Sequence, residues 1–582
     1  MLQAPSAVKA AIAQARVLAR NSQCRPDGVA AGEAATVAPA RLLTAPNRAA
    51  AARIIPRQSL GRGASGELGG MRERNINKPV DVVVMAAGKG TRMKSALPKV
   101  LHRLGGRALS AHVLDTAARV CARRVVVITG HGATEVEAAL SAWTSAEGGF
   151  GFTTLASQAV DATGGHATAG VSGASTVAAP QVQFVRQSPQ LGTGHAVQQA
   201  VPVLADDGIT LVLSGDVPLT QADTLRALLA LCSPAGGAEQ PSEDGLALLT
   251  LDMPDPTGYG RIVRQADGKV QAIVEHKDAT DAQRQITEIY SGIMAVPTAR
   301  LRVWLARLDN QNAQGEYYLT DVVKFAVTDG FPVRAHCIAD AVQVAGVNSP
   351  QQLAELERAL QASTARQMMA EGVRLADPAR FDLRGQLTCG QDVDIDINCV
   401  FEGRVVLGNG VRIGANCVVA NATIADGAVI HPFTHIDGEK LGVRVGPGAL
   451  IGPFARLRPG ADLGAEVHIG NFVEVKNSTL AAGAKANHLA YLGDATVGER
   501  VNYGAGSITA NYDGANKHRT VIEADVHVGS NCVLVAPVTI GAGGTVGGGS
   551  TITKSTAPGA LSVARGKQVS LAGWSRPKKA PK

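Results

Sequence analysis

The sequence is poor in aromatic residues, and this scarcity limits what can fill its core. Phe, Trp and Tyr make up 3% of the chain, whereas hydrophobic residues as a whole make up 45%. Aliphatic side chains and alanine must therefore fill the interior. The sequence also lacks an uninterrupted apolar run of the roughly 18 residues that a membrane-spanning helix needs. We therefore expect a protein without a transmembrane segment.

Paired cysteines are lacking as well. The eight cysteines include no CxxC pair and follow no regular spacing. Such a pattern argues against both a zinc site and a disulfide framework. It favours reduced thiols packed in a cytoplasmic protein.

The excess of positive charge is confined to one end of the chain. The net charge is +7, and residues 1–70 hold nine Lys/Arg against three Asp/Glu. The rest of the chain is nearly neutral, so the charge does not indicate nucleic-acid binding. We expect residues 1–77 to be a disordered basic extension that the chemistry does not need. Its Arg-rich composition also resembles a transit peptide, and Met71 is an alternative start.

Between Val80 and Gln343, strand-like and helix-like patterns alternate. The apolar runs VDVVVMAA, RRVVVITG and ITLVLSGD are typical of buried parallel strands, and ALSAHVLDTAARV and ADTLRALLALC have helical periodicity. This alternation predicts a doubly wound, Rossmann-like α/β domain with its site at the carboxyl ends of the strands. Two Gly/Ala/Ser-rich stretches, Ala146–Pro180 and Ser233–Gly245, are predicted to be loops.

A different texture follows this domain. Gln351–Glu371 is amphipathic without internal Gly or Pro, which predicts a rigid connector helix. From about Val393, an aliphatic residue followed by a small one recurs with a period of six, as in Leu407-Gly408, Ile413-Gly414 and Ile451-Gly452. This period predicts a left-handed parallel β-helix of hexapeptide repeats with roughly ten coils. Two such prisms that met only end to end would bury little surface between copies. We therefore expect the copies to associate, most simply as a cyclic homotrimer.

The stretch VVVMAAGKGTRMKSALPKVLH, which begins at Val82, predicts an anion site. It lacks the Gly-Lys-Ser/Thr of a Walker loop and the third glycine of a dinucleotide fingerprint. Its glycines nevertheless let backbone N–H groups face an anion, and Lys89, Arg92, Lys94 and Lys99 neutralise negative charge. On their own, these residues do not identify the anion.

Further motifs make a resemblance specific. AAGKGTRM and LPKVLH occur with QLGTGHA, GDVPL, DPTGYGRI, IVEHKDA and GEYYLTD, as in sugar-nucleotide pyrophosphorylases. The second half adds GPFARLRPGA, GNFVEVK, NHLAYLGDA and GAGSITANYDGANKHRT, and the chain ends in GWSRPKK. The whole resembles the bifunctional bacterial family that combines N-acetylglucosamine-1-phosphate uridylyltransferase with glucosamine-1-phosphate N-acetyltransferase. The resemblance implies a uridylyltransferase domain over 78–347, a linker helix over 348–372, and an acetyltransferase β-helix with a basic tail over 373–582.

The resemblance also implies the residues of the first site. The anion is then the triphosphate of UTP, with Arg92 and Lys99 as catalytic cations and Asp216 and Asn348 as ligands of Mg²⁺. UTP and the product UDP-N-acetylglucosamine would be bound by Met85, Ala86, Ala87, Gly88, Lys99, Gln187, Gly192, Thr193, Ser214, Gly215, Asp216, Gly260, Glu275 and Asn348. Charge neutralisation suits an in-line attack on phosphorus, which needs no covalent catalyst. Tyr290 departs from the family pattern, which often has Asn there, so a sugar contact by an amide cannot be carried over.

For the second site, the resemblance implies His488 as general base, assisted by Glu474. A histidine exchanges protons near neutral pH, which suits deprotonation of an amine. The acetyl acceptor would be bound by Arg458, Lys476, Tyr491 and Asn502, and acetyl-CoA by Ala505, Asn511, Tyr512, Ser530, Gly548 and Arg565. The family often has Ala at the position of Gly548. His431, His435 and His468 receive no chemical role.

Taken one at a time, these residues have plainer readings. Asp216 alone could cap a helix, Arg458 and Lys476 could be solvated, and His488 could be an ordinary polar histidine. Two other functions also remain open: a pyrophosphorylase whose β-helix is only a scaffold, and a non-enzymatic nucleotide-sugar sensor. The conjunction of motifs favours an enzyme. The resemblance implies that its substrates are UTP, acetyl-CoA and glucosamine-1-phosphate, and that it makes UDP-N-acetylglucosamine for peptidoglycan and lipopolysaccharide synthesis.

Overall fold

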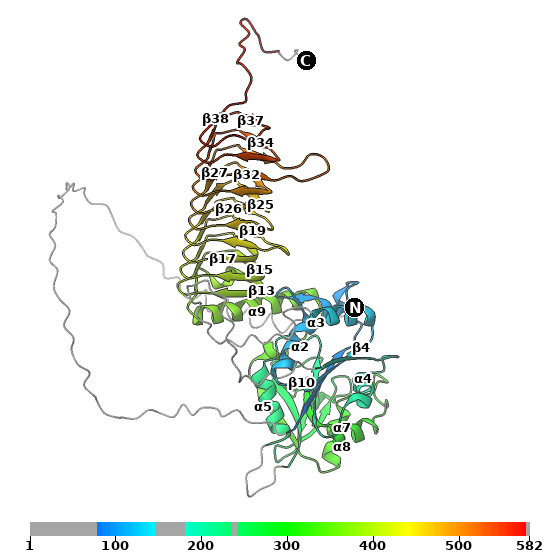
Figure 1. Cartoon of the computed structure of the whole chain (residues 1–582). Coiled ribbons are helices and arrows are strands. Elements are labelled where there is room, and N and C mark those ends of the chain that lie inside the picture. The colour runs from blue at the N-terminus through cyan, green and yellow to red at the C-terminus, as the bar shows by residue number, and fades with distance from the viewer. Residues whose placement is uncertain (1–77, 146–180, 235–242, 578–582) are drawn as a thin grey trace, which may run out of the picture.

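A computed structural model describes residues 78–145, 181–234 and 243–577. The expected N-terminal extension, the Ala146–Pro180 loop and most of the Ser233–Gly245 loop lie outside these residues. Figure 1 shows an α/β domain, a helix at its upper edge and a tall prism of stacked strands. Within the described residues, no helix is both long and apolar enough to cross a bilayer.

The α/β domain is built on a mixed sheet in the order β11-β7-β10-β6-β1-β4-β5. The strand predicted from VDVVVMAA is β1, Val80–Ala86, and it pairs in parallel with β4 and β6. β10, Glu288–Pro297, runs antiparallel to both of its neighbours, which the alternation did not predict. The remaining strands are β4 Arg124–Thr129, β5 Gln181–Arg186, β6 Ile209–Ser214, β7 Leu246–Asp252, β8 Arg261–Arg264, β9 Val270–Val274 and β11 Val333–Ile338.

Helices cover both faces of this sheet, which confirms the doubly wound prediction. One hydrophobic cluster joins the sheet to α2, α3 and α5, and a second joins it to α4, α7 and α8. Among the buried members of these two clusters, Trp304 and Tyr290 are the only aromatic residues, as the low aromatic content implies. The bounds are α2 Leu109–Arg119, α3 Ala133–Ser145, α4 Thr193–Ala200, α5 Ala222–Cys232, α6 Asp281–Arg284, α7 Thr298–Leu305 and α8 Asp321–Thr328.

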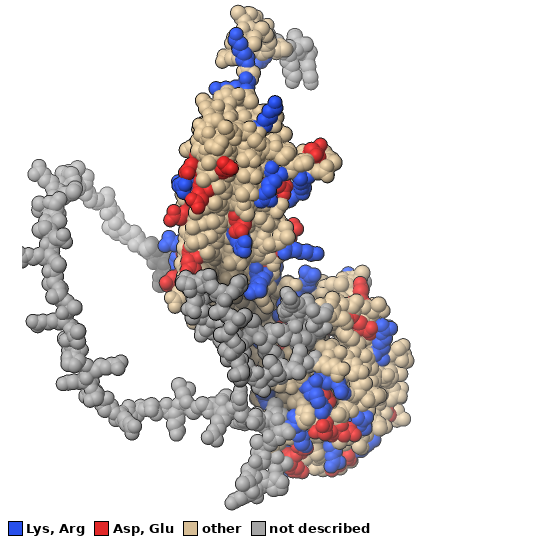
Figure 2. Space-filling view, in the orientation of Figure 1, with Lys and Arg blue, Asp and Glu red and all other residues tan. Residues whose placement is uncertain are grey.

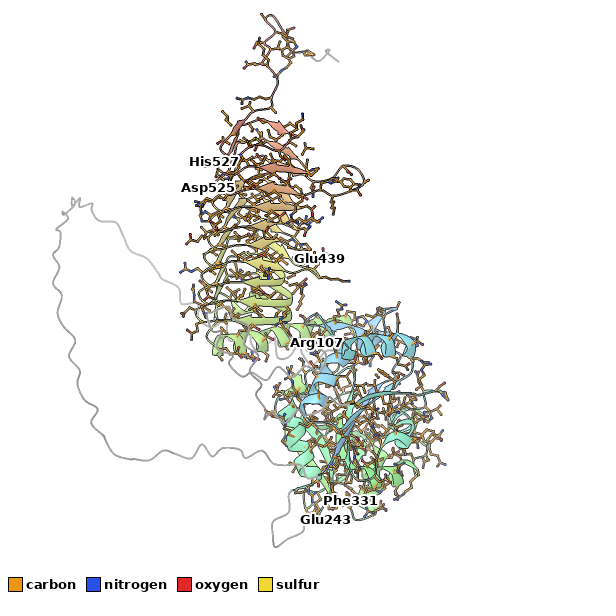
Figure 3. All side chains as sticks on the ribbon, viewed as in Figure 1. Arg107, Glu243, Phe331, Glu439, Asp525 and His527 are labelled. Carbon is orange, nitrogen blue, oxygen red and sulfur yellow. The ribbon has the colours of Figure 1, made fainter. Side chains whose placement is uncertain are left out.

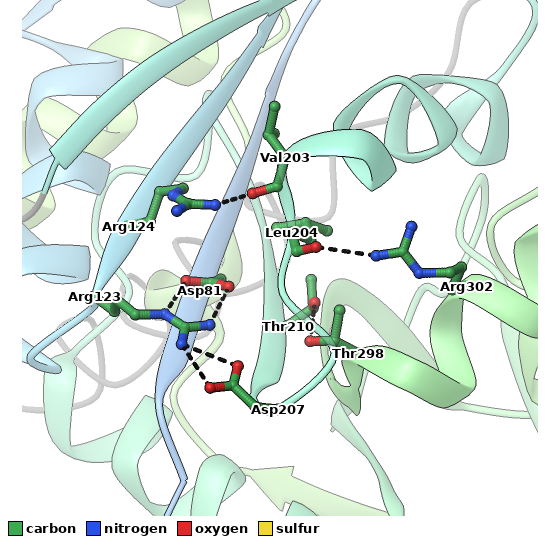
Figure 4. Close-up of polar contacts among 9 residues, drawn as sticks. All are labelled: Asp81, Arg123, Arg124, Val203, Leu204, Asp207, Thr210, Thr298 and Arg302. Atoms are coloured by element: carbon green, nitrogen blue, oxygen red, sulfur yellow. Dashed lines mark hydrogen bonds and ion pairs between the residues drawn. The ribbon is translucent and has the colours of Figure 1, made fainter.

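A buried carboxylate fastens the amino end of the central strand. Asp81 in β1 is fully buried, and the Arg123 guanidinium donates to both of its oxygens at 3.0 and 2.7 Å (Figure 4). Arg123 also donates to Asp207. Both carboxylates raise the pKa of Arg123, and the hydrogen bond to Asp81 has the larger effect. A buried charge needs such pairing. The sheet is thus secured at its amino ends, and its carboxyl ends remain free to form a site.

The predicted connector is α9, Pro350–Ala370. Ser349 caps it by accepting a hydrogen bond from the Gln352 amide at 3.2 Å, and Pro350 occupies the first turn, where no N–H is needed. On one side, Glu357 accepts a hydrogen bond from the Gly105 amide at 2.7 Å. On the other, the Gln361 amide bonds to both the N–H and the C=O of Leu383 at 2.8 Å. One helix therefore holds the α/β domain against the first coil of the prism.

The prism is a parallel β-helix, as the six-residue period predicted. Stacked residues such as Ile413, Ile430, Ile451 and Ile469 pair from coil to coil and are buried. The strands form three faces. The first face contains β12 Arg374–Leu375, β14 Asp394–Ile395, β16 Arg412–Ile413, β18 Val429–Ile430, β21 Leu450–Ile451, β24 His468–Asn471, β27 Lys485–His488, β30 Asn502–Tyr503, β33 His527–Val528, β36 Thr545–Val546 and β38 Leu561–Ser562.

The other two faces separate above three long strands that turn from one face into the next. These are β13 Phe381–Cys389, β15 Cys399–Leu407 and β17 Val418–Ile424. The second face contains β19 His435–Asp437, β22 Arg456–Leu457, β25 Glu474–Lys476, β28 Tyr491–Gly493, β31 Ile508–Ala510, β34 Val533–Val535 and β37 Thr551–Ile552. The third contains β20 Val443–Val445, β23 Asp462–Leu463, β26 Thr479–Leu480, β29 Ala495–Val497, β32 Thr520–Ile522 and β35 Val538–Ile540. Charges of both signs are interspersed over the visible surface (Figure 2).

Candidate active sites

The anion-binding loop leaves the carboxyl end of β1. Gly90 has φ +59°, and a side chain there would come within 2.6 Å of Lys99 Cβ, so only glycine fits. The loop then forms a short 3₁₀ turn whose Met93 is buried among Leu104, Leu109 and Leu356. Leu356 belongs to α9, so the connector helix supports the loop from behind. Gly88 has open space before it, which leaves its backbone accessible to a ligand.

Oxygen ligands and cations converge beside this loop. Asp216, two residues beyond the end of β6, accepts a hydrogen bond from Ser214 Oγ at 2.6 Å and pairs with Lys99 Nζ. Lys99 Nζ also donates to Asn348 Oδ1 at 2.7 Å, and Arg92 donates to the same oxygen at 2.9 Å. The structure thus brings Arg92, Lys99, Asp216 and Asn348 together from distant parts of the sequence. A carboxylate and an amide oxygen are ligands that suit Mg²⁺.

A second part of the predicted nucleotide site lies at the start of α4. Gln187 is buried, and its Nε2 donates to the Gly192 carbonyl at 2.9 Å and lies 3.2 Å from His195 Nδ1. These two partners fix the orientation of the amide. Thr193 Oγ1 accepts a hydrogen bond from the Leu319 amide at 3.1 Å. His195 was not among the predicted residues, although it belongs to the QLGTGHA motif.

The predicted sugar pocket is partly buried. A side chain at Gly260 would stand 3.8 Å from both Glu275 oxygens and 2.9 Å from Ile273, so glycine leaves the carboxylate accessible. Burial raises the pKa of Glu275, and a hydrogen bond from Thr320 at 3.0 Å offsets this in part. The Tyr290 amide donates to the Gly260 carbonyl at 2.9 Å. Gly260, Glu275 and Tyr290 therefore adjoin one another.

Tyr290 has an unusual environment for a phenol. Its hydroxyl is buried and has no hydrogen-bond partner among the described residues. Burial, and then the negative charge of Glu275, raise the tyrosine pKa well above its ordinary value. Burial and the charge of Asp216 likewise raise the pKa of Tyr259, so Tyr259 lies near Asp216. Tyr259 was not among the predicted residues, although the DPTGYGRI motif contains it.

The second predicted site lies on the β-helix, where Arg458 and Glu474 form an ion pair on the second face. Arg458 Nη1 lies 2.8 Å from Glu474 Oε1, and Arg456 approaches the other oxygen at 3.6 Å. Tyr491 follows Glu474 in register on the next coil, and Lys476 stands at the end of the same strand as Glu474. The neighbouring Lys517, more than burial, lowers the pKa of Lys476. Arg458, Glu474, Lys476 and Tyr491 are thus brought together, beside the unpredicted Lys517.

His488 ends β27 at the edge of the first face. Its Nδ1 lies 2.9 Å from Asn471 Oδ1 on the coil below. Since an amide oxygen only accepts, Nδ1 is the donor and Nε2 retains a lone pair for a proton. Glu474, the expected assistant, contacts arginines instead. The GNFVEVK motif contains both Asn471 and Glu474, but sequence spacing could not tell which of them meets the imidazole.

Four of the six predicted acetyl-CoA residues, Ala505, Ser530, Gly548 and Arg565, stack along the corner between the first and second faces. The Ala505 carbonyl accepts a hydrogen bond from the Asn531 amide at 2.7 Å, and the Ser530 carbonyl accepts one from Gly549 at 2.8 Å. Arg565 Nη1 donates to the Gly548 carbonyl at 2.9 Å. A methyl group at Gly548 would meet the Ser530 oxygen at 3.4 Å, an ordinary contact. Either glycine or alanine therefore fits this backbone.

Asn511 and Tyr512 lie where a hairpin arm leaves the second face. Asn511 Nδ2 donates to Asp494, and the Tyr512 hydroxyl donates to the Gly514 carbonyl at 2.6 Å. A backbone bridge from Tyr512 to Lys517 closes the arm, which projects sideways from the prism in Figure 1.

Asn502 is the one predicted acceptor residue on the first face. Its register neighbours are Lys485 and His527, on the coils below and above. These side chains line a hollow of about 750 Å³, whose lining is completed by Gly448, Glu466, His468, Gly483, Arg500 and Val501. Figure 3 shows Asp525 and His527 on the same side of the prism. Asn502 thus faces away from Lys476 and Tyr491 within one chain.

The fold and both sites define a class: a nucleotidyltransferase joined by a helix to a hexapeptide β-helix. The family model of the MobA-like NTP transferase domain matches residues 82–375. The "Bifunctional protein GlmU" of Albidiferax ferrireducens is 70% identical over 504 residues, covering 86% of this chain and 100% of that protein. That of Polaromonas naphthalenivorans is 72% identical over 508 residues (86% and 99%), and that of Azoarcus sp. 52% over 501 (86% and 100%). The chain belongs to the GlmU family of bifunctional uridylyltransferase/N-acetyltransferase enzymes.

Proposed function

We propose that this chain makes UDP-N-acetylglucosamine in two steps at two separate sites. The β-helix transfers acetyl from acetyl-CoA to glucosamine-1-phosphate, and the α/β domain then transfers UMP from UTP to the product, releasing pyrophosphate. The product serves peptidoglycan and lipopolysaccharide synthesis in the cytoplasm. One observation carries the proposal: the same chain holds a cluster of cations and oxygen ligands around Asp216 in the α/β domain and an oriented histidine, His488, on the β-helix. In this proposal the uridylyltransferase domain spans 78–347, the linker helix 348–372 and the acetyltransferase domain 373–582.

In the uridylyl step, a phosphate oxygen of the acceptor attacks the α-phosphorus of UTP, and the bond to pyrophosphate breaks in line with the attack. Asp216 and Asn348 would hold Mg²⁺, which neutralises phosphate charge when bound. Lys99 and Arg92, already 2.7 and 2.9 Å from Asn348 Oδ1, turn to the triphosphate oxygens. The backbone from Met85 to Gly88, with Ser214 and Gly215, lines the nucleotide.

The remaining residues of this site choose the substrates. The Gln187 amide is fixed by Gly192 and His195, so its carbonyl oxygen is presented to the N3–H of uracil, a donor that cytosine lacks. Gly192 and Thr193 complete the base pocket. Gly260 and Glu275 bind the acceptor sugar, and Tyr290 supports them from its buried position, its amide bonded to the Gly260 carbonyl.

In the acetyl step, His488 Nε2 takes a proton from the amine as the amine nitrogen attacks the thioester carbonyl carbon. Asn511 and Tyr512 stabilise the oxyanion that forms. When the adduct collapses, the C–S bond breaks and the CoA sulfur receives the proton from His488. Asn471 orients the imidazole of His488. Glu474 assists indirectly, because it positions the arginines that bind the sugar phosphate.

We propose a homotrimer, and the placement of Asn502 supports association between copies. It lies on the first face, whereas Arg458, Lys476 and Tyr491 lie on the second. One chain cannot direct both sets at one sugar phosphate, but two adjacent copies can. Ala505, Ser530, Gly548 and Arg565 then form a track for acetyl-CoA along the corner between these faces. A cyclic trimer lets each copy supply both sets.

A paired assay tests the two-site proposal. The full chain receives glucosamine-1-phosphate, acetyl-CoA, UTP and Mg²⁺, and free CoA and pyrophosphate are followed separately. His488→Ala should abolish CoA release but keep pyrophosphate release when N-acetylglucosamine-1-phosphate is supplied. His435→Ala, an exposed histidine on the second face, is the matched control and should release both products. Pyrophosphate without CoA from the wild-type chain would reduce the β-helix to a scaffold, and neither product would favour a sensor.

A further inference from the structure

One imidazole at the start of α4 lies between two glutamine amides. His195 Nδ1 is 3.2 Å from Gln187 Nε2, and His195 Nε2 is 3.2 Å from Gln199 Nε2. His195 is partly buried, and the rings of His195 and Tyr317 have centroids 6.2 Å apart. Since Gln187 is the residue proposed to contact the base, whatever fixes its amide bears on the choice of nucleotide.

These two contacts cannot both be hydrogen bonds donated by amide nitrogens. A neutral imidazole has one nitrogen that accepts and one N–H that donates. One of the two glutamines must therefore present its oxygen to the ring. Gln187 Nε2 also lies 2.9 Å from the Gly192 carbonyl oxygen, which only accepts. Turning the Gln187 amide over would set two oxygens against each other, so the nitrogen of Gln187 must face the imidazole.

The position of the imidazole proton follows from this orientation. His195 Nδ1 accepts from Gln187 and carries no proton, so the ring proton is on Nε2. Gln199 is partly buried, and its amide is bonded to the His195 carbonyl at 3.1 Å, so Gln199 is the glutamine that can turn. After turning, the Gln199 oxygen accepts the hydrogen bond from Nε2–H. The hydrogen bonds then run in one direction, from Gln187 through His195 to Gln199.

We propose that His195 is the positioning residue that selects the base of the nucleotide. Its unprotonated Nδ1 holds the Gln187 nitrogen inward and leaves Gln187 Oε1 to face the base. That oxygen accepts a hydrogen bond from a ring N–H, which uracil has at N3, whereas cytosine has a lone pair there. The site therefore takes pyrimidines with a protonated N3. This inference rests on the proposed function and assigns base selection to a residue that acts through Gln187.

The test compares UTP with CTP as substrates of the full chain, at saturating N-acetylglucosamine-1-phosphate and Mg²⁺. His195→Leu removes the acceptor but keeps a bulky side chain, whereas His195→Asn keeps an acceptor oxygen close to the position of Nδ1. We expect the ratio of kcat/KM for UTP to kcat/KM for CTP to fall about tenfold in His195→Leu, the factor that corresponds to one lost hydrogen bond. In His195→Asn the ratio should stay within about threefold of wild type. Acetyl transfer should be unchanged in both variants.

Controls separate the possible failures. Gln198→Leu is the matched control on the same helix, because it loses the hydrogen bond from its amide to the Leu305 carbonyl at 2.7 Å and should leave the ratio unchanged. A wild-type chain that uses neither nucleotide would overturn the proposed function itself. Equal use of UTP and CTP by wild type, a preference that survives in His195→Leu, or one that falls as far in His195→Asn or Gln198→Leu would overturn the role of His195 alone. If His195→Leu does not fold, nitrogen NMR of the wild-type chain with isotope-labelled histidine must find the His195 proton on Nε2, and a proton on Nδ1 counts against the proposal.

Discussion

Replacing Asp216 with asparagine is the sharpest perturbation of the uridylyl site. Asparagine keeps the size of the side chain and an oxygen that can accept the 2.6 Å hydrogen bond from Ser214. The backbone contact from the Val347 amide to the Asp216 carbonyl, at 3.0 Å, is untouched. What disappears is the negative charge that faces Lys99, where both side chains are 15% exposed. The change therefore isolates charge from shape.

The structure sets two magnitudes for Asp216→Asn. Lys99 retains its 2.7 Å contact with Asn348, so the lost charged hydrogen bond costs about 1.5 kcal/mol, the low end for such bonds. The melting temperature should then fall by roughly 3–6 °C. The rate effect is larger, because removing one group that stabilises transition-state charge lowers kcat by about 10²–10³-fold. Acetyl transfer should not change.

The assay measures pyrophosphate and CoA release by Asp216→Asn over a range of Mg²⁺ concentrations, with Mn²⁺ binding in the presence of UTP measured by electron paramagnetic resonance. Asp223→Asn is the matched control, since Asp223 is 90% exposed beside Arg226 on α5. Pyrophosphate release within threefold of wild type, with unchanged Mn²⁺ affinity, would refute the metal-ligand assignment. An equal loss of both activities would refute the separation of the sites.

Two further predictions concern the sugar pocket. Because burial raises the pKa of Glu275 above its ordinary value of 4.5, its stabilising contribution is present below pH 4.5 and is lost as pH rises through the raised pKa. Glu275→Gln should therefore stabilise the fold at pH 8 relative to wild type but not at pH 4, and it should raise the KM for the sugar phosphate. Urea unfolding at both pH values checks the stability. A variant that is less stable than wild type at pH 8 would contradict the prediction. Tyr290→Phe removes a buried hydroxyl that lacks a protein partner, so the unliganded fold should gain roughly 1 kcal/mol. Because the buried hydroxyl does not reach the pocket surface, the KM of the same variant for N-acetylglucosamine-1-phosphate should stay within twofold of wild type, and a several-fold higher KM would show that the hydroxyl meets the sugar.

The elements that sequence predicted well are those with strong local periodicity. The runs at Val80, Arg123 and Ile209 became β1, β4 and β6, and the hexads placed residues such as Leu407, Ile413 and Ile451 in the core. The antiparallel β10 was not predicted, because strand direction depends on partners far away in the sequence. The local sequence pattern determines which residues of a strand are buried, whereas the partners and direction of the strand depend on the whole sheet.

The candidate sites show the same division. Motifs selected residues that the structure does bring together, such as Lys99, Asp216 and Asn348, although the roles of these residues stay predictions. Motifs could not show that Glu474 faces arginines, or that Asn471 meets His488. They also could not place Asn502 on another face, because the coils before it differ in length: Ile430 pairs with Ile451, 21 residues further on, whereas Ala486 pairs with Tyr503, 17 residues further on. A residue's face therefore cannot be counted from the hexads alone.

The stacking of the β-helix has a consequence for how the chain folds. Each coil pairs only with the coils directly before and after it, as Leu450 does with His468 and Arg456 with Glu474. Partners are thus close in sequence, unlike those of most parallel sheets, and each added coil needs to close only one short loop. Order can spread from one coil to the next once a first coil exists. The coil that rests on α9 has an early partner, so the β-helix should grow from the connector helix toward the C-terminus, in the order of synthesis.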